Sequence, residues 1–141
     1  MFHMELALNE KWNNKKVGST GEQITAKYYQ DQGFRILGLN YLKKWGEIDV
    51  IAKKNKKVYF IEVKTVSYET KSALYQAVAR KTWRPEERVD DFKLKKLFRV
   101  IDTWLKDKKW TGDWQIDVAA VRIVPRETYA TIEIISNIIL D

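Results

Sequence analysis

The chain has 141 residues, of which 45% are hydrophobic and 32% are charged, and it contains no cysteine. This size allows one folded domain with a core of its own, and the lack of cysteine excludes disulfides and thiolate metal sites. Lys and Arg outnumber Asp and Glu by 26 to 19, and the resulting net charge of +7 suits a polyanionic partner. No signal peptide or bilayer-spanning run is visible, so we expect a cytoplasmic protein without membrane contact.

The first segments of the chain predict a helix. Residues 1–16 are polar without a persistent period, so we expect a tail or a loosely packed helix before a single domain over residues 17–141. Ser19 or Thr20 can cap a helix that runs to about Asp31. The glycine that follows this segment is a typical signal for the end of a helix.

Glu22 falls in the first turn of this predicted helix. A carboxylate there can stabilise the positive end of the helix dipole by a few tenths to about 1 kcal/mol. Residues 34–39 then predict a first strand, and residues 40–45 its exit loop. The residues alone leave Glu22 open between a helix-dipole role and a role in a functional site.

The segment from Gly46 to Thr65 predicts a β-hairpin. Two runs rich in β-branched and aromatic residues flank Asn55 and Lys56, which we expect to form a two-residue turn. Such a turn places Asp49 opposite Glu62, Ile51 opposite Phe60 and Glu47 opposite Lys64. Strict alternation then puts on one face Glu47, Asp49, Ile51, Phe60, Glu62 and Lys64, and on the other Ile48, Val50, Tyr59, Ile61 and Val63.

Three carboxylates on one small surface need a cation between them, because carboxylates across a strand pair repel. A hard divalent ion such as Mg²⁺ takes oxygen ligands and supplies that charge. The alternative is a cross-strand ion pair of Glu47 with Lys64 on a solvated face, with Asp49 and Glu62 merely exposed. Ile51 and Phe60 share the face and need cover, which favours a site at the edge of a packed region.

Three motifs in chain order carry a resemblance to a known family. Glu22, then Gly46-Glu47-Ile48-Asp49, then Glu62-Val63-Lys64 resemble the PD-(D/E)XK nuclease superfamily, and within it the YraN-like proteins, which are similar to archaeal Holliday junction resolvases. The similarity covers about residues 17–135. The proline of the superfamily's name is absent before Asp49.

The resemblance implies a metal-dependent active site. Asp49 and Glu62 are expected to bind Mg²⁺, with Mn²⁺ as a substitute, through their carboxylates and the backbone carbonyl of Val63. Glu22 is expected to reach the metal or its water, and Lys64 to orient that water or to neutralise charge in the transition state. Catalytic residues are therefore expected at Glu22, Asp49, Glu62 and Lys64.

In the family pattern a glycine-rich helix start carries a glutamate, here Gly18-Ser19-Thr20-Gly21-Glu22, and two further positions also match. Asn40 follows the first predicted strand, and Asp117 lies in the element Gln115-Ile116-Asp117-Val118. Asp117 is a charge within an otherwise apolar strand, and such charges are rarely buried without a partner. Its role stays open between metal binding and a structural pairing with a lysine or a backbone amide.

The remainder of the chain predicts two helices and two strands. The helices are expected at about residues 72–80 and 85–106, and the strands at about 114–124 and 129–135. Residues 134–140 are apolar, so they either dock on the sheet or form a contact in a homodimer. The element order predicts an α/β protein, a restriction-endonuclease-like α/β/α sandwich with a central mixed five-stranded sheet.

Clustered basic residues suggest a nucleic-acid surface, although a generally Lys-rich proteome would give a similar excess. Candidate contacts are Lys43, Lys44, Lys81, Trp83, Arg84, Lys93 and Lys96. Trp83 could equally pack inside its own domain.

The leading functional hypothesis is a Mg²⁺-dependent endonuclease that acts on DNA in a branched or otherwise structured form. The alternative is a catalytically silent nucleic-acid-binding or assembly module with the same fold. The chain lacks a Walker-type phosphate loop, a dinucleotide-binding glycine motif, a Ser-His-Asp set and Cys/His zinc spacing, so those chemistries have no support.

Overall fold

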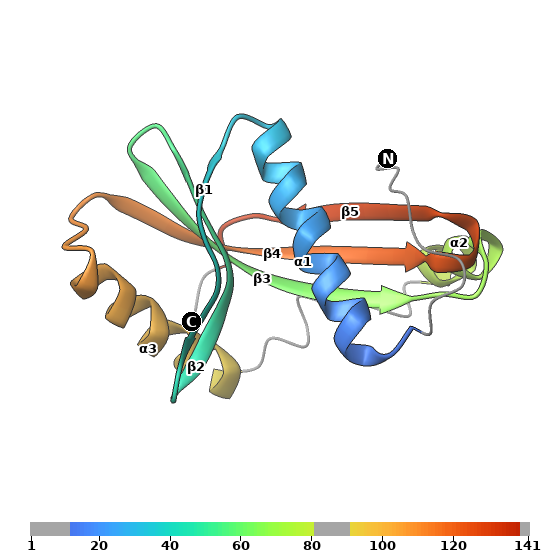
Figure 1. Ribbon diagram of the computed structural model, residues 1–141, viewed down its shortest axis with the longest axis horizontal. Helices are drawn as coiled ribbons and strands as arrows, with labels where there is room; N and C mark the ends of the chain where they lie inside the picture. The colour runs from blue at the N-terminus through green and yellow to red at the C-terminus, as the bar shows by residue number, and fades with distance from the viewer. Residues whose placement is uncertain (1–11, 81–90, 139–141) are drawn as a thin grey trace.

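Five strands form one mixed sheet in the order β1-β2-β3-β4-β5 in the computed structural model, which describes residues 12–80 and 91–138 (Figure 1). In chain order the elements are α1 (Asn14–Asp31), β1 (Arg35–Lys43), β2 (Gly46–Lys54), β3 (Lys57–Ser67), α2 (Lys71–Arg80), α3 (Asp91–Asp107), β4 (Asp113–Val124), the 3-10 helix η2 (Pro125–Glu127) and β5 (Tyr129–Ile135). Only β3 and β4 are parallel, and the segment with α2 and α3 connects them. The predicted α/β class and mixed five-stranded sheet are confirmed.

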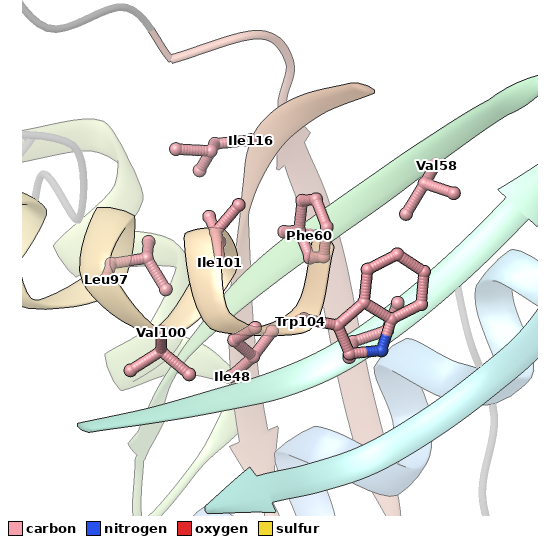
Figure 2. Close-up of a cluster of buried hydrophobic side chains, with 9 residues drawn as sticks. Ile48, Val58, Phe60, Leu97, Val100, Ile101, Trp104 and Ile116 are labelled. Atoms are coloured by element: carbon pink, nitrogen blue, oxygen red, sulfur yellow. The ribbon is translucent and has the colours of Figure 1, made fainter. Parts of the chain in front are cut away.

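Helices cover both faces of the sheet. On one face, Val100 and Trp104 of α3 pack with Ile48 and Phe60 of the hairpin (Figure 2). On the other face, Tyr29 of α1 packs against apolar side chains of β2, β3 and β4. Among the described residues, no helix is long and apolar enough to cross a membrane.

Helix α1 begins earlier than predicted. Asn13 caps it by accepting a hydrogen bond of 2.8 Å from the backbone N–H of Lys16, so the helix starts at Asn14 and not after Ser19 or Thr20. Residues 14–16, which the sequence assigned to a tail or a loosely packed helix, are thus the first turn of α1. The end at Asp31 is as predicted, and Gly33 adopts φ +92° just beyond it.

Glu22 consequently lies inside α1, and its predicted place in the first turn is wrong. The glycine before it does not mark a helix start. A Cβ atom at Gly21 would overlap the Oγ1 atom of Thr65 and come within 2.9 Å of its Cβ atom. Gly21 therefore allows α1 to approach β3 closely, which brings Glu22 over the sheet.

The hairpin register is confirmed over its outer half. The pairs run from Lys54 with Lys57 to Val50 with Ile61, and Asn55 adopts φ 56° in the turn. They include the predicted pair of Ile51 with Phe60, which fixes the register. The pairing then stops, so the predicted pairs of Asp49 with Glu62 and of Glu47 with Lys64 are wrong.

The strands separate at this point because β2 stays with its other neighbour. Its pairing with β1 continues to Gly46 opposite Lys43. Figure 1 shows β2 and β3 running together from their turn and then diverging, which opens a fork between them. The end of β2 beyond the fork rests on α3.

The predicted alternation of side chains also fails at the fork. Ile48 packs with Ile51 and Phe60 on the α3 side, whereas Val50 packs on the α1 side. Ile48 and Val50 were expected to share a face. The bend of β2 where it leaves β3 interrupts the two-residue period and leaves Asp49 on the side of α1, near Glu22.

Strand β1 is one edge of the sheet and is longer than expected. It continues to Lys43 through the segment predicted as an exit loop. Its register shifts between Ile36 and Gly38, and Asn40 has φ 52° within the strand. Large apolar side chains are exposed along it, at Leu37, Leu39 and Leu42.

The later elements follow the sequence expectations closely. Helix α2 and strands β4 and β5 begin and end within one residue of the predicted bounds. The predicted start of the next helix falls among residues 81–90, outside the described residues. At the C-terminal end, the N–H of Ile138 donates to the carbonyl of Ile116 at 2.7 Å, so this part of the apolar segment docks on the domain. The homodimer contact stays a prediction.

Candidate functional site

Three carboxylates converge where α1 crosses the fork. One oxygen each from Glu22 on α1 and from Glu47 and Asp49 on β2 lie within 4.8 Å of one another. Glu22 and Asp49 are partly buried and Glu47 is exposed. The close approach of α1 to β3 and the bend in β2 create this cluster, so it joins segments that are far apart in the sequence.

Asp49 occupies the mouth of the fork. Its Oδ2 atom accepts a hydrogen bond of 2.8 Å from the backbone N–H of Val63, which replaces the strand pairing that ends nearby. Burial, followed by repulsion from Glu62, raises the pKa of Asp49 from its ordinary value of 3.8 to about 8, against the opposing effect of the Val63 N–H. Glu22 and Glu47 raise it further. The site therefore disfavours the anionic form of Asp49 when no cation is near.

The pKa of Glu22 is raised as well, but by less than that of Asp49. Burial raises its pKa, a hydrogen bond from the side chain of Asn40 lowers it, and the charges of Glu47 and Glu62 raise it again. Asn40 lies on β1 between the pairs that flank Asp49, so three neighbouring elements supply the cluster and its nearest hydrogen-bond donor.

Glu62 and Lys64 extend the acidic cluster along β3. The Nζ atom of Lys64 lies 3.1 Å from the Oε1 atom of Glu62, and their side chains are 19% and 22% exposed. Lys64 thus pairs with Glu62 and not across the hairpin as the solvated-face alternative supposed. Glu62 is close enough to raise the pKa of both Glu22 and Asp49, so it belongs to the same electrostatic group.

This donor set fits a hard divalent cation. Its ligand atoms are carboxylate oxygens, which Mg²⁺ and Mn²⁺ prefer, and the raised pKa values show an excess of negative charge that a cation would relieve. Val63, whose carbonyl was expected as a ligand, is held against Asp49 by its own N–H. Glu47, which the sequence left open, is one of the three converging residues.

Asp117 has a structural role. It accepts hydrogen bonds from the hydroxyl of Tyr29 at 2.8 Å, the amide of Gln115 at 2.7 Å and the backbone N–H of Asn137 at 3.0 Å. It is buried and lies outside the cluster of three carboxylates. A backbone amide, that of Asn137, is thus among its partners, as the structural alternative expects.

A basic groove adjoins the acidic cluster. It has a volume of about 920 Å³ and is lined by five cationic side chains and one carboxylate, those of Lys43, Lys44, Lys95, Lys96, Arg99 and Glu47. It brings together three predicted nucleic-acid contacts, Lys43, Lys44 and Lys96. Of the other predicted contacts, Lys81, Trp83 and Arg84 fall outside the described residues, and the side chain of Lys93 is not described.

The sequence analysis missed two cations of this groove, Lys95 and Arg99. A signal was present, because residues four apart on a helix share a face and Lys95 and Arg99 have that spacing. Both side chains are exposed on α3, away from its buried residues.

Comparisons with known proteins point to one family. The model of a family described as "Uncharacterised protein family UPF0102" matches residues 21–121. A UPF0102 protein of Alkaliphilus oremlandii is 38% identical over 109 residues, which cover 69% of this chain and 92% of that protein. One from Campylobacter fetus is 36% identical over 106 residues, with 74% and 81% covered. One from Mycolicibacterium vanbaalenii is 35% identical over 121 residues, with 81% and 89% covered. The chain therefore belongs to the UPF0102 family, the YraN-like branch of the PD-(D/E)XK nuclease superfamily.

Proposed function

We propose that this protein is a Mg²⁺-dependent endonuclease that hydrolyses phosphodiester bonds in DNA, with a branched or otherwise structured DNA as its substrate. The observation that carries the proposal is the convergence of Glu22, Glu47 and Asp49 to within 4.8 Å beside the pair of Glu62 and Lys64. The membership in a nuclease superfamily supports it. Access to DNA would require the cytoplasmic location expected from the sequence.

The proposed ligands are Asp49, Glu62 and the carbonyl of Val63, and Glu22 reaches the metal or its bound water. When bound, Mg²⁺ would polarise the phosphoryl group and lower the pKa of a coordinated water. The protein fixes its own donors beforehand, because Val63 orients Asp49 and Asn40 orients Glu22.

Lys64 has the position of a group that assists the reaction. Its side chain is mostly buried, and its Nζ atom lies 3.1 Å from the Oε1 atom of Glu62, so the ammonium lies beside the acidic cluster. From there it can donate a hydrogen bond to the attacking water or to a phosphoryl oxygen whose charge grows in the transition state. Glu47 adds negative charge at the exposed side of the cluster.

The second candidate function is a nucleic-acid-binding or assembly module that does not cut. The basic groove is the observation that favours this function, because its five cationic side chains can bind phosphate whether or not a metal is bound nearby. Binding without turnover would be expected if the carboxylates no longer held a metal.

A cleavage assay separates the two functions. Linear, flapped and four-way DNA are incubated with Mg²⁺, with Mn²⁺ and with chelator, using wild type and Asp49→Ala. We expect metal-dependent cutting by wild type alone, and a rise in melting temperature with Mg²⁺ in wild type but not in Asp49→Ala. If both proteins bind DNA, neither cuts it, and Mg²⁺ raises the melting temperature of neither, the result supports the binding module and contradicts the nuclease.

A further inference from the structure

The basic groove is built to hold its shape. It lies between the turn that joins β1 to β2 and the first part of α3. Gly46 adopts φ +151° there, and a Cβ atom at this position would come within 2.8 Å of the Cγ2 atom of Val100. The turn therefore rests directly on α3, which fixes the two walls of the groove relative to each other.

Trp45 and Arg99 contact each other in the wall of the groove. The indole N–H of Trp45 donates to the Oγ1 atom of Thr103 at 3.2 Å, which fixes the orientation of the ring. The guanidinium of Arg99 lies over this ring, 5.0 Å from its centroid. A cation held on an aromatic face keeps its outward N–H groups available for an anion while losing little freedom on binding.

We propose that this groove binds one DNA strand beside the bond that is cut, with Lys95 and Arg99 contacting its phosphates and Trp45 positioning Arg99. Its position next to the cut bond rests on the proposed function, whereas strand binding itself does not. Glu47 lines the groove and also belongs to the acidic cluster, so a strand in the groove leads directly to the carboxylates. The five cations complement the phosphates of a strand that passes close to those acids.

The size of the groove indicates the form of the DNA. Its volume of about 920 Å³ is at the upper end of the roughly 300–1,000 Å³ typical of pockets for small molecules. A groove of this volume accommodates a few nucleotides of one strand. We therefore expect DNA with an unpaired or splayed arm, which can place one strand in the groove, to bind more tightly than a blunt duplex.

The test measures binding of the full chain in chelator, so that no cutting occurs. Fluorescence anisotropy is recorded across a salt series with a labelled single strand, a blunt duplex and the same duplex with an unpaired arm. Lys95→Ala/Arg99→Ala is compared with Lys106→Ala/Lys108→Ala, which removes the same charge from exposed positions outside the groove. For a single strand, each lost phosphate contact makes the slope of log affinity against log salt concentration shallower by about 0.7. Two lost contacts therefore correspond to about a 25-fold loss of affinity at 0.1 M salt.

We expect that loss for the groove variant, less than a threefold change for the control, and tighter binding of the armed duplex than of the blunt one. Equal losses in both variants, no loss in the groove variant, or equal affinity for the two duplexes would overturn the proposal. Asp49→Asn separates it from the proposed function, because this variant should bind like wild type or better. If wild type cuts no DNA but loses affinity when the groove is mutated, strand binding is supported and the proposed nuclease function is not. If wild type cuts DNA and the groove variant binds normally, the nuclease function is supported and strand binding by the groove is refuted.

The positioning role of Trp45 has its own readout. Trp45→Leu should lower DNA affinity about as much as Arg99→Ala does, and should cost nothing further in a protein that already carries Arg99→Ala. A general structural role would instead lower affinity equally in both backgrounds. Melting temperatures of all variants accompany the measurement. Thr103→Val gives a milder second variant, because it removes the acceptor of the indole N–H together with the hydroxyl that donates to the carbonyl of Arg99.

Discussion

Asp49 should reduce the stability of the metal-free protein, and Asp49→Asn should reveal it. Asn keeps an oxygen that can accept the N–H of Val63 but has no charge to desolvate. In the folded protein Asp49 takes up a proton up to about pH 8, whereas in the unfolded chain it does so only below about pH 4. Between these values the folded state binds more protons, so the free energy of unfolding falls as pH rises and reaches its minimum above pH 8.

The rise in pKa sets the size of the effect. From 3.8 to about 8, at about 1.4 kcal/mol per pH unit, the upper limit is about 6 kcal/mol. Water entry and relaxation around the charge reduce this, so we expect Asp49→Asn to be about 3 kcal/mol more stable than wild type at pH 9. At pH 4 the two proteins should have similar stability.

Urea unfolding in chelator at pH 4, 6, 7.5 and 9 measures this difference. Asp31→Asn is the matched control, because Asp31 is an exposed residue paired with Lys27 at the far end of α1. Added Mg²⁺ should restore the stability of wild type at pH 9 and leave Asp49→Asn unchanged. Parallel pH profiles for wild type and Asp49→Asn would refute the reasoning that burial and repulsion act on this carboxylate.

Four further substitutions test other parts of the structure. Glu62→Gln should weaken Mg²⁺ binding by calorimetry and abolish cleavage, with DNA affinity level or higher because a repelling charge is removed. Lys64→Ala should lower the cleavage rate about 100-fold or more while Mg²⁺ affinity is retained; loss of both would contradict a role in turnover alone. Gly21→Ala should destabilise the protein by about 1–3 kcal/mol in urea unfolding, because its methyl group meets Thr65, and Thr65→Ala should recover part of this. Asp117→Ala should cost about 3 kcal/mol without changing Mg²⁺ affinity, since it leaves one buried and two partly buried donors without an acceptor.

Local patterns in the sequence predicted the order of the elements and the outer half of the hairpin, but neither the start of α1 nor the end of β1. Asn55 tolerates the left-handed backbone of a tight turn, and that turn fixes the register as far as Val50 opposite Ile61. The spacing of apolar residues along the chain, with the periods typical of strands and helices, predicted the bounds of β4, β5 and α2. These features depend on neighbours in the sequence or on one paired strand, so the sequence contains the information directly.

The geometry of the site depends on contacts that no local pattern encodes. The departure of β2 from β3 follows from its pairing with β1 and its support on α3, so strict alternation misplaced Ile48 relative to Val50. Gly21 looked like a helix start but serves the approach of α1 to Thr65. The acidic residues could be named from their motifs, whereas the hydrogen bonds of Asp49 to Val63 and of Glu22 to Asn40 required the structure.

The irregular edge strand has a consequence for solubility. A nine-residue edge with exposed leucines offers a row of free amides and carbonyls to which a strand of another molecule could add, the first step of sheet-to-sheet aggregation. The register shift at Ile36 and Gly38 and the left-handed Asn40 divide this row into short pieces, so an added strand cannot remain in register along it. Because Asn40 also holds the carboxylate of Glu22, one residue both protects the exposed margin of the sheet and orders the acidic cluster. A substitution that straightened β1 would therefore expose the protein to self-association and disturb the site at the same time.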